Sequence, residues 1–260
     1  MSNRPIRRIE EFIGAVRDDA SAWPNHQPRW FRGEPSSDKP LVPTLYREGF
    51  TENENPLLQS FRARAPGFYS EVPHRDHTDQ WLFLARHAGL PTRLLDWSES
   101  ALVVLLFGLR ANKQPAVVWM LNPLELNYLA HEHLDDRNRQ LLRREFPLPW
   151  HPTEEAAKNG AFENIRGAWE YDRAGVELPV AVYPTYVHPR LRGQRACFTI
   201  HGKRKEGLNH IAPQSVLKQY QLDPEFCDSM LKDLQILGIT DSMAFPDLDG
   251  LASELKYQFS

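Results

Sequence analysis

The sequence predicts an α+β fold in one domain, built on a mixed β-sheet. Some segments repeat apolar residues at helical spacing, while other short segments are apolar and rich in β-branched residues. The two kinds do not alternate in the regular order of a parallel α/β sheet. A chain of 260 residues can bury a sizeable core in a single domain. We assign residues 1–24 to an N-terminal helix and residues 25–258 to the domain, with a helical insertion at about 125–175.

Elements in the first half of the chain are set by apolar spacing and by Gly and Pro. Ile6, Ile9, Phe12 and Val16 recur at helical spacing and indicate an amphipathic first helix. Gly89 is a natural C-terminal stop for a helix that ends at His87. After the first helix we expect a strand at 29–32, a loop at 34–43, helices at 56–65 and 78–87, a strand at 92–97, a helix at 99–109 and a strand at 116–121.

The second half begins with a helix that Asn122 and Pro123 are suited to start. Residues 130–173 are charged and carry Trp150 and Trp169, which fits surface helices around a proline-containing loop. After them we expect strands at 180–187, 194–201 and 216–222, a helix from Asp223 to Gly238, and a terminal helix after 245–250.

Bulk composition excludes several classes of protein. The chain is 41% hydrophobic and 25% charged with a net charge of −3, so no strong nucleic-acid footprint is visible. Its most apolar run, Ala101 to Leu109, has about half of the roughly 20 residues that a membrane span needs. The first residues lack the apolar region of a secretory signal. Two cysteines without metal or disulfide spacing fit a reducing compartment, so we expect a cytoplasmic protein with no membrane partner.

Charged side chains stand inside two segments that otherwise have core-like composition. Buried charges are costly unless they are paired or hydrogen-bonded, so these residues indicate either a site or a structural network. Arg32 offers a planar fork of donors suited to phosphate, and Gly33 lets a ligand approach the backbone closely. The alternative is that Arg32 forms a salt bridge with a core carboxylate such as Asp96.

The segment from Thr92 to Ser98 alternates in character. In a strand, Arg93 would face opposite to Asp96, which could then point toward Arg32. A buried Arg–Asp network that holds two strands together explains the same pattern. Ser98 is placed to cap the following helix, and a capping serine can also present its hydroxyl to an anion.

Four further residues have both a functional and a structural interpretation. His87 could act as a general base or a metal ligand, although a lone histidine is more often structural. Gln194 opens a strand, where its amide could bond a ribose hydroxyl or only a backbone group. Asp247 and Asp249 could bind a divalent cation with Asp96 or His87, or could cap the next helix. The chain has no Gly-rich phosphate loop, nucleophile elbow or Cys/His metal cluster.

These residues resemble the FRG-domain family, named for the triplet that Phe31-Arg32-Gly33 matches. The most specific block is His-x-Gly-x-Pro-Thr-Arg-Leu-Leu-Asp-Trp-Ser at residues 87–98. Further matching blocks lie at residues 41–47, 194–200 and 245–252, so the resemblance spans most of residues 25–255.

A second, weaker resemblance is to the ADP-ribosyltransferases. Those enzymes carry Arg-Gly or His-Gly at the end of a first strand, a Ser/Thr motif leading into an apolar helix, and a glutamate on a later strand. Arg32-Gly33, Ser98 and Gln194 follow the same order. The resemblance implies a split β-sheet with NAD as substrate in a cleft, where Arg32, Gln194 and His87 would serve catalysis. The residues that would bind NAD are Arg32, Gly33, Arg93, Asp96 and Ser98.

Gln194 departs from the transferase pattern, because a neutral amide stabilises a developing oxocarbenium ion much less than a carboxylate does. The leading interpretation is an ADP-ribosyltransferase-like enzyme or an NAD-binding or nucleotide-binding effector without a metal site. As an enzyme it would cleave the nicotinamide–ribose bond and pass ADP-ribose to a macromolecule or to water. The family resemblance suggests a prokaryotic toxin or phage-defence role. The alternatives are a metal-dependent nuclease using Asp96, His87 and Asp247, and a non-catalytic module that binds a nucleotide or nucleic acid.

Overall fold

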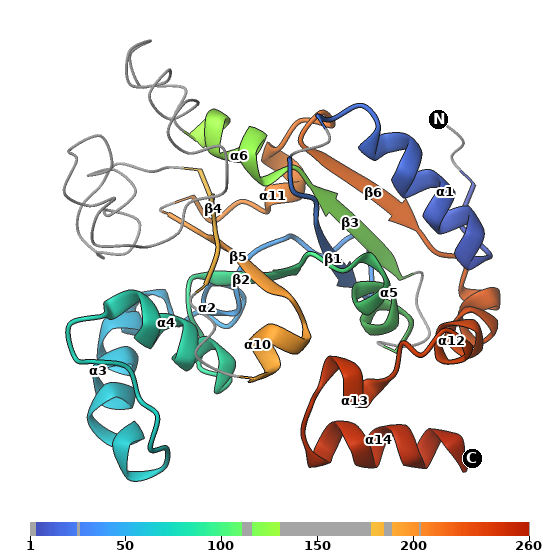
Figure 1. Cartoon of the computed structure of the whole chain (residues 1–260). Helices are drawn as coiled ribbons and strands as arrows, with labels where there is room; N and C mark the ends of the chain where they lie inside the picture. The colour runs from blue at the N-terminus through green and yellow to red at the C-terminus, as the bar shows by residue number, and fades with distance from the viewer. Residues whose placement is uncertain are drawn as a thin grey trace.

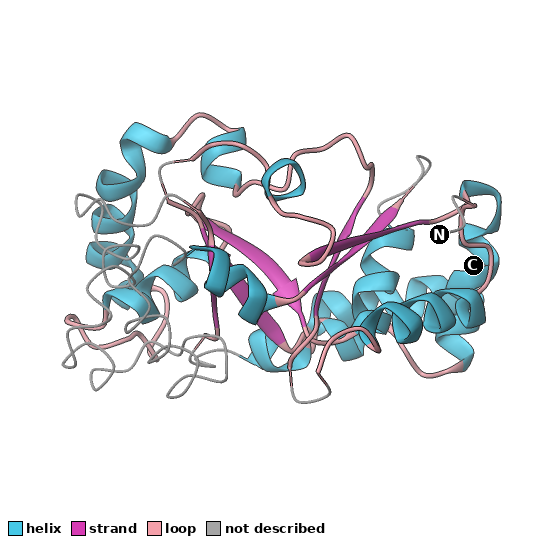
Figure 2. Ribbon diagram, turned by 90° about the horizontal axis from the view of Figure 1, so that it is seen from above, coloured by secondary structure: helices cyan, strands magenta, loops and turns pink. Residues whose placement is uncertain are grey.

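The computed structural model describes residues 4–24, 27–110, 116–130, 178–184, 189–202 and 204–259. Within that part of the chain, helices pack on both sides of one six-stranded sheet, which confirms the α+β class (Figures 1 and 2). The strands are β1 (Trp30–Glu34), β2 (Leu94–Ser98), β3 (Val117–Leu121), β4 (Val180–Val182), β5 (Ala196–Ile200) and β6 (Leu217–Gln221).

The longer helices lie close to where apolar spacing predicts them. The helix expected at 78–87 has those bounds, and the others shift by a few residues at their ends. The longer helices are α1 (Ile9–Ala20), α3 (Glu54–Arg64), α4 (Thr78–His87), α5 (Ala101–Arg110), α6 (Pro123–Ala130), α12 (Cys227–Ile236) and α14 (Leu248–Gln258). Of the expected insertion at 125–175, only the part within α6 is described, and the segment with Trp150 and Trp169 lies outside the described residues.

Among the described residues, four short helices are missing from the sequence prediction. They are α2 (Thr44–Arg47), α10 (Pro189–Gly193), α11 (Leu208–Ile211) and α13 (Asp241–Ala244). Each has only four or five residues, which is too short for a 3.6-residue period to be recognised.

The strand order is β4-β5-β2-β1-β3-β6, and each pair of neighbouring strands runs antiparallel. The expectation of a mixed sheet is therefore wrong for the described strands. Side-chain alternation has a period of two in both parallel and antiparallel strands, so the pattern reveals a strand's faces but not its direction. The parallel contact in this part of the chain is an isolated bridge between Ile6 and Leu222.

The sheet opens at its centre, between β1 and β2. These two strands are paired in register only at Phe31 and Ser98, whereas β1 with β3 and β2 with β5 are each paired over five residues. Beyond that one pair, Arg32 and Asp96 stand on strands that have separated.

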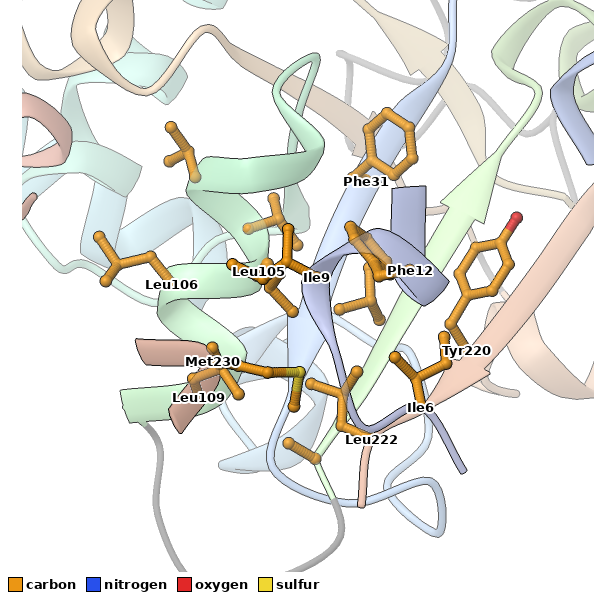
Figure 3. Packing of buried hydrophobic residues seen from close by; sticks show 14 of the residues in the cluster. Ile6, Ile9, Phe12, Phe31, Leu105, Leu106, Leu109, Tyr220, Leu222 and Met230 are labelled. Atoms are coloured by element: carbon orange, nitrogen blue, oxygen red, sulfur yellow. The ribbon is translucent and has the colours of Figure 1, made fainter. Parts of the chain in front are cut away.

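In the described part of the chain, three apolar clusters hold helices and loops against the sheet. The first lies under α1, α5 and α12 and includes Phe12, Phe31, Leu105, Tyr220 and Met230 (Figure 3). The second joins α4 to β2, β4 and β5 on the same side of the sheet. The third covers the opposite face and is rich in tryptophan, with Trp30, Trp97 and Trp119 packed beneath α6 and α11.

Gly33 lets α5 approach β1 closely. A Cβ atom at this position would lie 2.8 Å from the carbonyl oxygen of Val104 and 3.0 Å from the backbone nitrogen of Gly108. Gly33 is therefore required for strand–helix packing, because any side chain would push the helix away.

Across the described ranges, no helix combines the length and the apolar character that a membrane crossing requires.

Candidate functional site

Arg32 bridges the opening between β1 and β2. Its Nε and Nη2 atoms lie 2.8 Å and 2.6 Å from Oε1 of Glu34, and its Nη1 donates to the backbone oxygen of Asp96 at 2.7 Å. The side chains of Arg32 and Glu34 are only 13% and 6% exposed. Arg32 therefore links the two strands, but its main carboxylate partner is Glu34 on its own strand, and Asp96 Oδ2 lies 3.8 Å from Nη1.

The carboxylate of Asp96 is held mainly by Arg86, a residue of α4 that the sequence prediction does not name. Arg86 Nε lies 3.1 Å from both carboxylate oxygens, and its Nη2 lies 2.5 Å from Oδ2. Burial raises the pKa of Asp96, but Arg86 and then Arg32 outweigh burial and hold that pKa below its usual value. The Asp96 side chain as a whole remains 40% exposed.

Arg47 brings a third guanidinium to the same place. Its Nη2 donates to Thr44 Oγ1 at 3.2 Å, and Arg86 Nη1 donates to the same oxygen at 3.1 Å. The pKa of Arg47 is lowered, first by partial burial and then by the positive charge of Arg32. We call Arg32, Arg47 and Arg86 the arginine cluster. Its three positive charges face the carboxylates of Glu34 and Asp96, and the carboxylate of Glu48 also lies close enough to act on Arg86.

A buried histidine borders this cluster. His201 is fully buried, and its Nε2 lies 3.1 Å from Thr199 Oγ1, which also accepts a hydrogen bond from Trp97. Burial, and secondly the charge of Arg32, lower the pKa of His201 from 6.5 to about 3. The histidine is therefore neutral near pH 7 and does not add to the positive charge of the cluster.

Ser98 and Gln194 meet at the closed end of the strand opening. Ser98 pairs with Phe31 on one side and with Ala196 on the other, and its Oγ donates to the backbone oxygen of Gln194 at 2.6 Å. The structure therefore brings Ser98 and the Gln194 backbone together, whereas the Arg32 side chain contacts Glu34 and the backbone of Asp96. The helix cap is different, because Ser100 rather than Ser98 accepts from the backbone nitrogens of α5.

Glu99 is a carboxylate at this point that the sequence prediction misses. Its Oε1 accepts from the Tyr183 hydroxyl at 2.6 Å, and its Oε2 lies 3.3 Å from Nη2 of Arg195. The backbone nitrogen of Glu99 also donates to the carbonyl of Arg195, the residue after Gln194. An acidic residue in a Ser-Glu-Ser turn looks like an ordinary first-turn helix residue, so the sequence does not reveal that Glu99 lies beside Arg195.

Arg93 is placed differently from the other candidates. Its Nη2 lies 2.6 Å from Oε2 of Glu54 in α3, and both side chains are largely buried. This pair fastens the start of β2 to α3. Arg93 is therefore not among the groups that surround Asp96.

His87 and Asp247 lie together at a separate cavity of about 680 Å³ between α3, α4 and the start of α14. The walls are mainly apolar and include Leu57, Phe61 and Leu84. The carboxylate of Asp247 accepts from the backbone nitrogen of Gly250 at 2.9 Å, so it caps α14 as its structural interpretation predicts.

The metal-site alternative gains no support from this arrangement. Within the described ranges, no three His, Cys, Asp or Glu side chains are grouped so that they could hold a metal ion. Asp96 is engaged by Arg86, whereas His87 and Asp247 line the separate cavity. The proposed nuclease ligands are therefore not assembled in this part of the chain.

An α+β domain with an arginine–carboxylate network at the opening of its sheet is the class that the fold and site define. Residues 27–116 match the family model of the FRG domain, so the chain contains an FRG domain and the family prediction is confirmed. The match includes every residue of the arginine cluster and both of its carboxylates. No curated protein and no solved structure gave a significant match.

Proposed function

We propose that this FRG-domain protein binds NAD or a related nucleotide, with the phosphates held at the arginine cluster. The supporting observation is the convergence of the Arg47 and Arg86 guanidinium groups on the Thr44 hydroxyl. Guanidinium groups bind phosphate oxygens through paired, charge-assisted hydrogen bonds.

The three arginines have different tasks in this proposal. Arg32 is mostly buried and already bonded to Glu34 and Asp96, so it shapes the site and supplies long-range positive charge. Arg47 is the most exposed of the three and is bonded to a neutral hydroxyl, so its remaining donors are available for phosphate. The exposed part of Asp96 would accept a ribose hydroxyl, as acidic residues do in dinucleotide sites.

The enzymatic part of the proposal is ADP-ribosyltransferase-like cleavage of the nicotinamide–ribose bond, with ADP-ribose passed to a macromolecule or to water. Gln194 and Ser98 lie at one end of the strand opening, in the order that the transferase resemblance implies. Glu99 lies close to Gln194, because its backbone nitrogen donates to the carbonyl of Arg195. It thereby adds the carboxylate that position 194 lacks. A toxin or phage-defence role, with an unknown macromolecular target, is the biological setting that the family resemblance suggests.

Calorimetric titration of the purified protein with NAD and with ADP-ribose tests the binding proposal. We expect micromolar affinity for the wild type and at least a tenfold loss in Arg47→Met, about 1.4 kcal/mol. Arg204→Met is the matched control, since Arg204 is an exposed arginine paired with Glu206. The proposal fails if folded wild-type protein gives no heat with either compound, or if both variants bind equally well.

A further inference from the structure

Helix α14 lies on the molecule with its polar side inward. Gly250 faces Phe245, and a Cβ atom at that position would clash with the Phe245 carbonyl. One turn later, Glu254 Oε2 accepts from the backbone nitrogen of Ser242 at 3.1 Å. The ring of Tyr257 is 6.0 Å from the guanidinium of Arg110. These contacts fix which side of α14 faces the body of the protein.

The opposite side of α14 is apolar and faces solvent. Leu248 and Phe259 are 82% and 87% exposed, and Leu251 and Leu255 are each 44% exposed. With 3.6 residues per turn, these four side chains form one stripe opposite Gly250, Glu254 and Tyr257. We call them the α14 stripe. A contiguous apolar stripe on an exposed helix is typical of a surface that another molecule covers. Figure 1 shows α14 at the edge of the molecule, beyond α13.

We propose that the α14 stripe binds the same stripe of a second copy of this chain, with the two helices antiparallel. The argument is charge complementarity along the stripe. Asp249 and Lys256 are seven residues apart, so they lie on the same flank of the stripe near its opposite ends.

Antiparallel pairing turns this spacing into two equivalent attractive contacts. A two-fold axis near residue 252 places Asp249 of each copy beside Lys256 of the other, and brings Leu248 against the carboxyl-terminal half of the facing stripe. Parallel pairing would instead place each acidic residue level with its own equivalent. The helix therefore complements a reversed copy of itself in both shape and charge.

The helix has only 11 residues, so the contact is small and we expect dimerisation in the micromolar range. Sedimentation velocity of the full chain from ~1 to ~200 µM covers that range. The wild type is expected to pass from monomer to dimer, and Leu255→Glu should remain a monomer throughout. Leu237→Glu is the matched control, because Leu237 is a 58%-exposed leucine at the end of α12, outside the α14 stripe.

Exchanging the charges at positions 249 and 256 distinguishes this specific pairing from nonspecific hydrophobic association. Asp249→Lys and Lys256→Asp are each expected to weaken the dimer several-fold, and the variant with both changes should recover most of the affinity. Circular dichroism melting curves check that every variant stays folded, since Asp249 also lies in the favourable first turn of α14.

The proposal is overturned if the wild type stays monomeric at every concentration. It is also overturned if Leu255→Glu still dimerises, or if the double exchange restores nothing. None of these outcomes depends on nucleotide binding.

Discussion

The Nη1 atom of Arg32 donates a 2.7 Å hydrogen bond to the backbone oxygen of Asp96, across strands that have otherwise stopped pairing. At this point a hydrogen bond from a side chain links the two strands in place of backbone-to-backbone pairing. The same Asp96 receives Arg86 from α4 on its carboxylate, so one residue joins two strands and a helix. Folding of the sheet and formation of the arginine cluster are therefore linked through Asp96.

Replacing Arg32 by methionine is expected to lower the free energy of unfolding by about 3 kcal/mol, because it leaves the buried Glu34 carboxylate without its partner. Urea unfolding followed by tryptophan fluorescence measures the loss. Arg204→Met, at an exposed pair, should change stability by less than about 0.5 kcal/mol. Equal stability of the two variants would show that the Arg32 network does not hold the strands together.

Gly33→Ala should destabilise the protein by about 2 kcal/mol, since the new methyl group would press on the Val104 carbonyl and the backbone of Gly108. Gly14 offers a matched control within helix α1, where nothing lies within 4 Å of an added Cβ atom. Gly14→Ala should stabilise the protein by about 0.5–1 kcal/mol. Thermal unfolding of both variants gives the comparison. If Gly33→Ala leaves stability unchanged, α5 can move away from β1 at little energetic cost.

Much of the fold follows from sequence periodicity. The pattern over 78–87 gives the bounds of α4, and the strand segments around Arg32 and Asp96 lie where alternation predicts them. Strand order does not follow, because neighbours such as β1 and β3 come from distant parts of the chain. Alternation within a strand contains no information about which strand lies beside it.

The candidate site shows the same limit. The sequence singles out Arg32, Ser98 and Gln194 as candidates because they stand in motifs along the chain. It does not distinguish Arg86 and Arg47, since a basic residue near a helix end is ordinary in sequence. Their significance arises only when α2 and α4 bring both to the Thr44 hydroxyl.

Acid should destabilise the protein through His201. The pKa of His201 falls from 6.5 to about 3 on folding. Between pH 3 and pH 6.5 the histidine is therefore protonated in the unfolded chain and neutral in the folded protein. The stability that His201 provides is fully present above about pH 6.5 and is lost as pH falls toward 3, by about 1.4 kcal/mol per pH unit. Urea unfolding from pH 7 to pH 5 measures the slope. His201→Gln should reduce that slope by about one proton, and an unchanged slope would assign the acid sensitivity to other groups.

Asp96 predicts a second acid transition at lower pH. Its folded pKa lies below the unfolded value near 3.8, so its contribution is present above that value and disappears as pH falls through the folded pKa. The difference in unfolding free energy between wild type and Asp96→Asn should therefore be largest near pH 6 and shrink below about pH 4. A difference that stays constant down to pH 3 would show that Arg86 does not favour the ionised form.

We predict that Glu99 supplies the carboxylate for bond cleavage. Measuring the rate of nicotinamide release from NAD distinguishes this role from NAD binding by the arginine cluster. Glu99→Gln should reduce the rate of release by at least about 100-fold while NAD affinity changes little, because loss of the charge affects the oxocarbenium-like state more than the bound substrate. Arg47→Met should instead weaken NAD binding. Gln194→Glu is expected to raise the rate, since Ser98 binds the backbone oxygen of residue 194 and the exchange leaves that bond intact. Unchanged release in Glu99→Gln would remove Glu99 from the chemistry, whereas NAD binding without any release in every variant would identify a nucleotide-binding module rather than an enzyme.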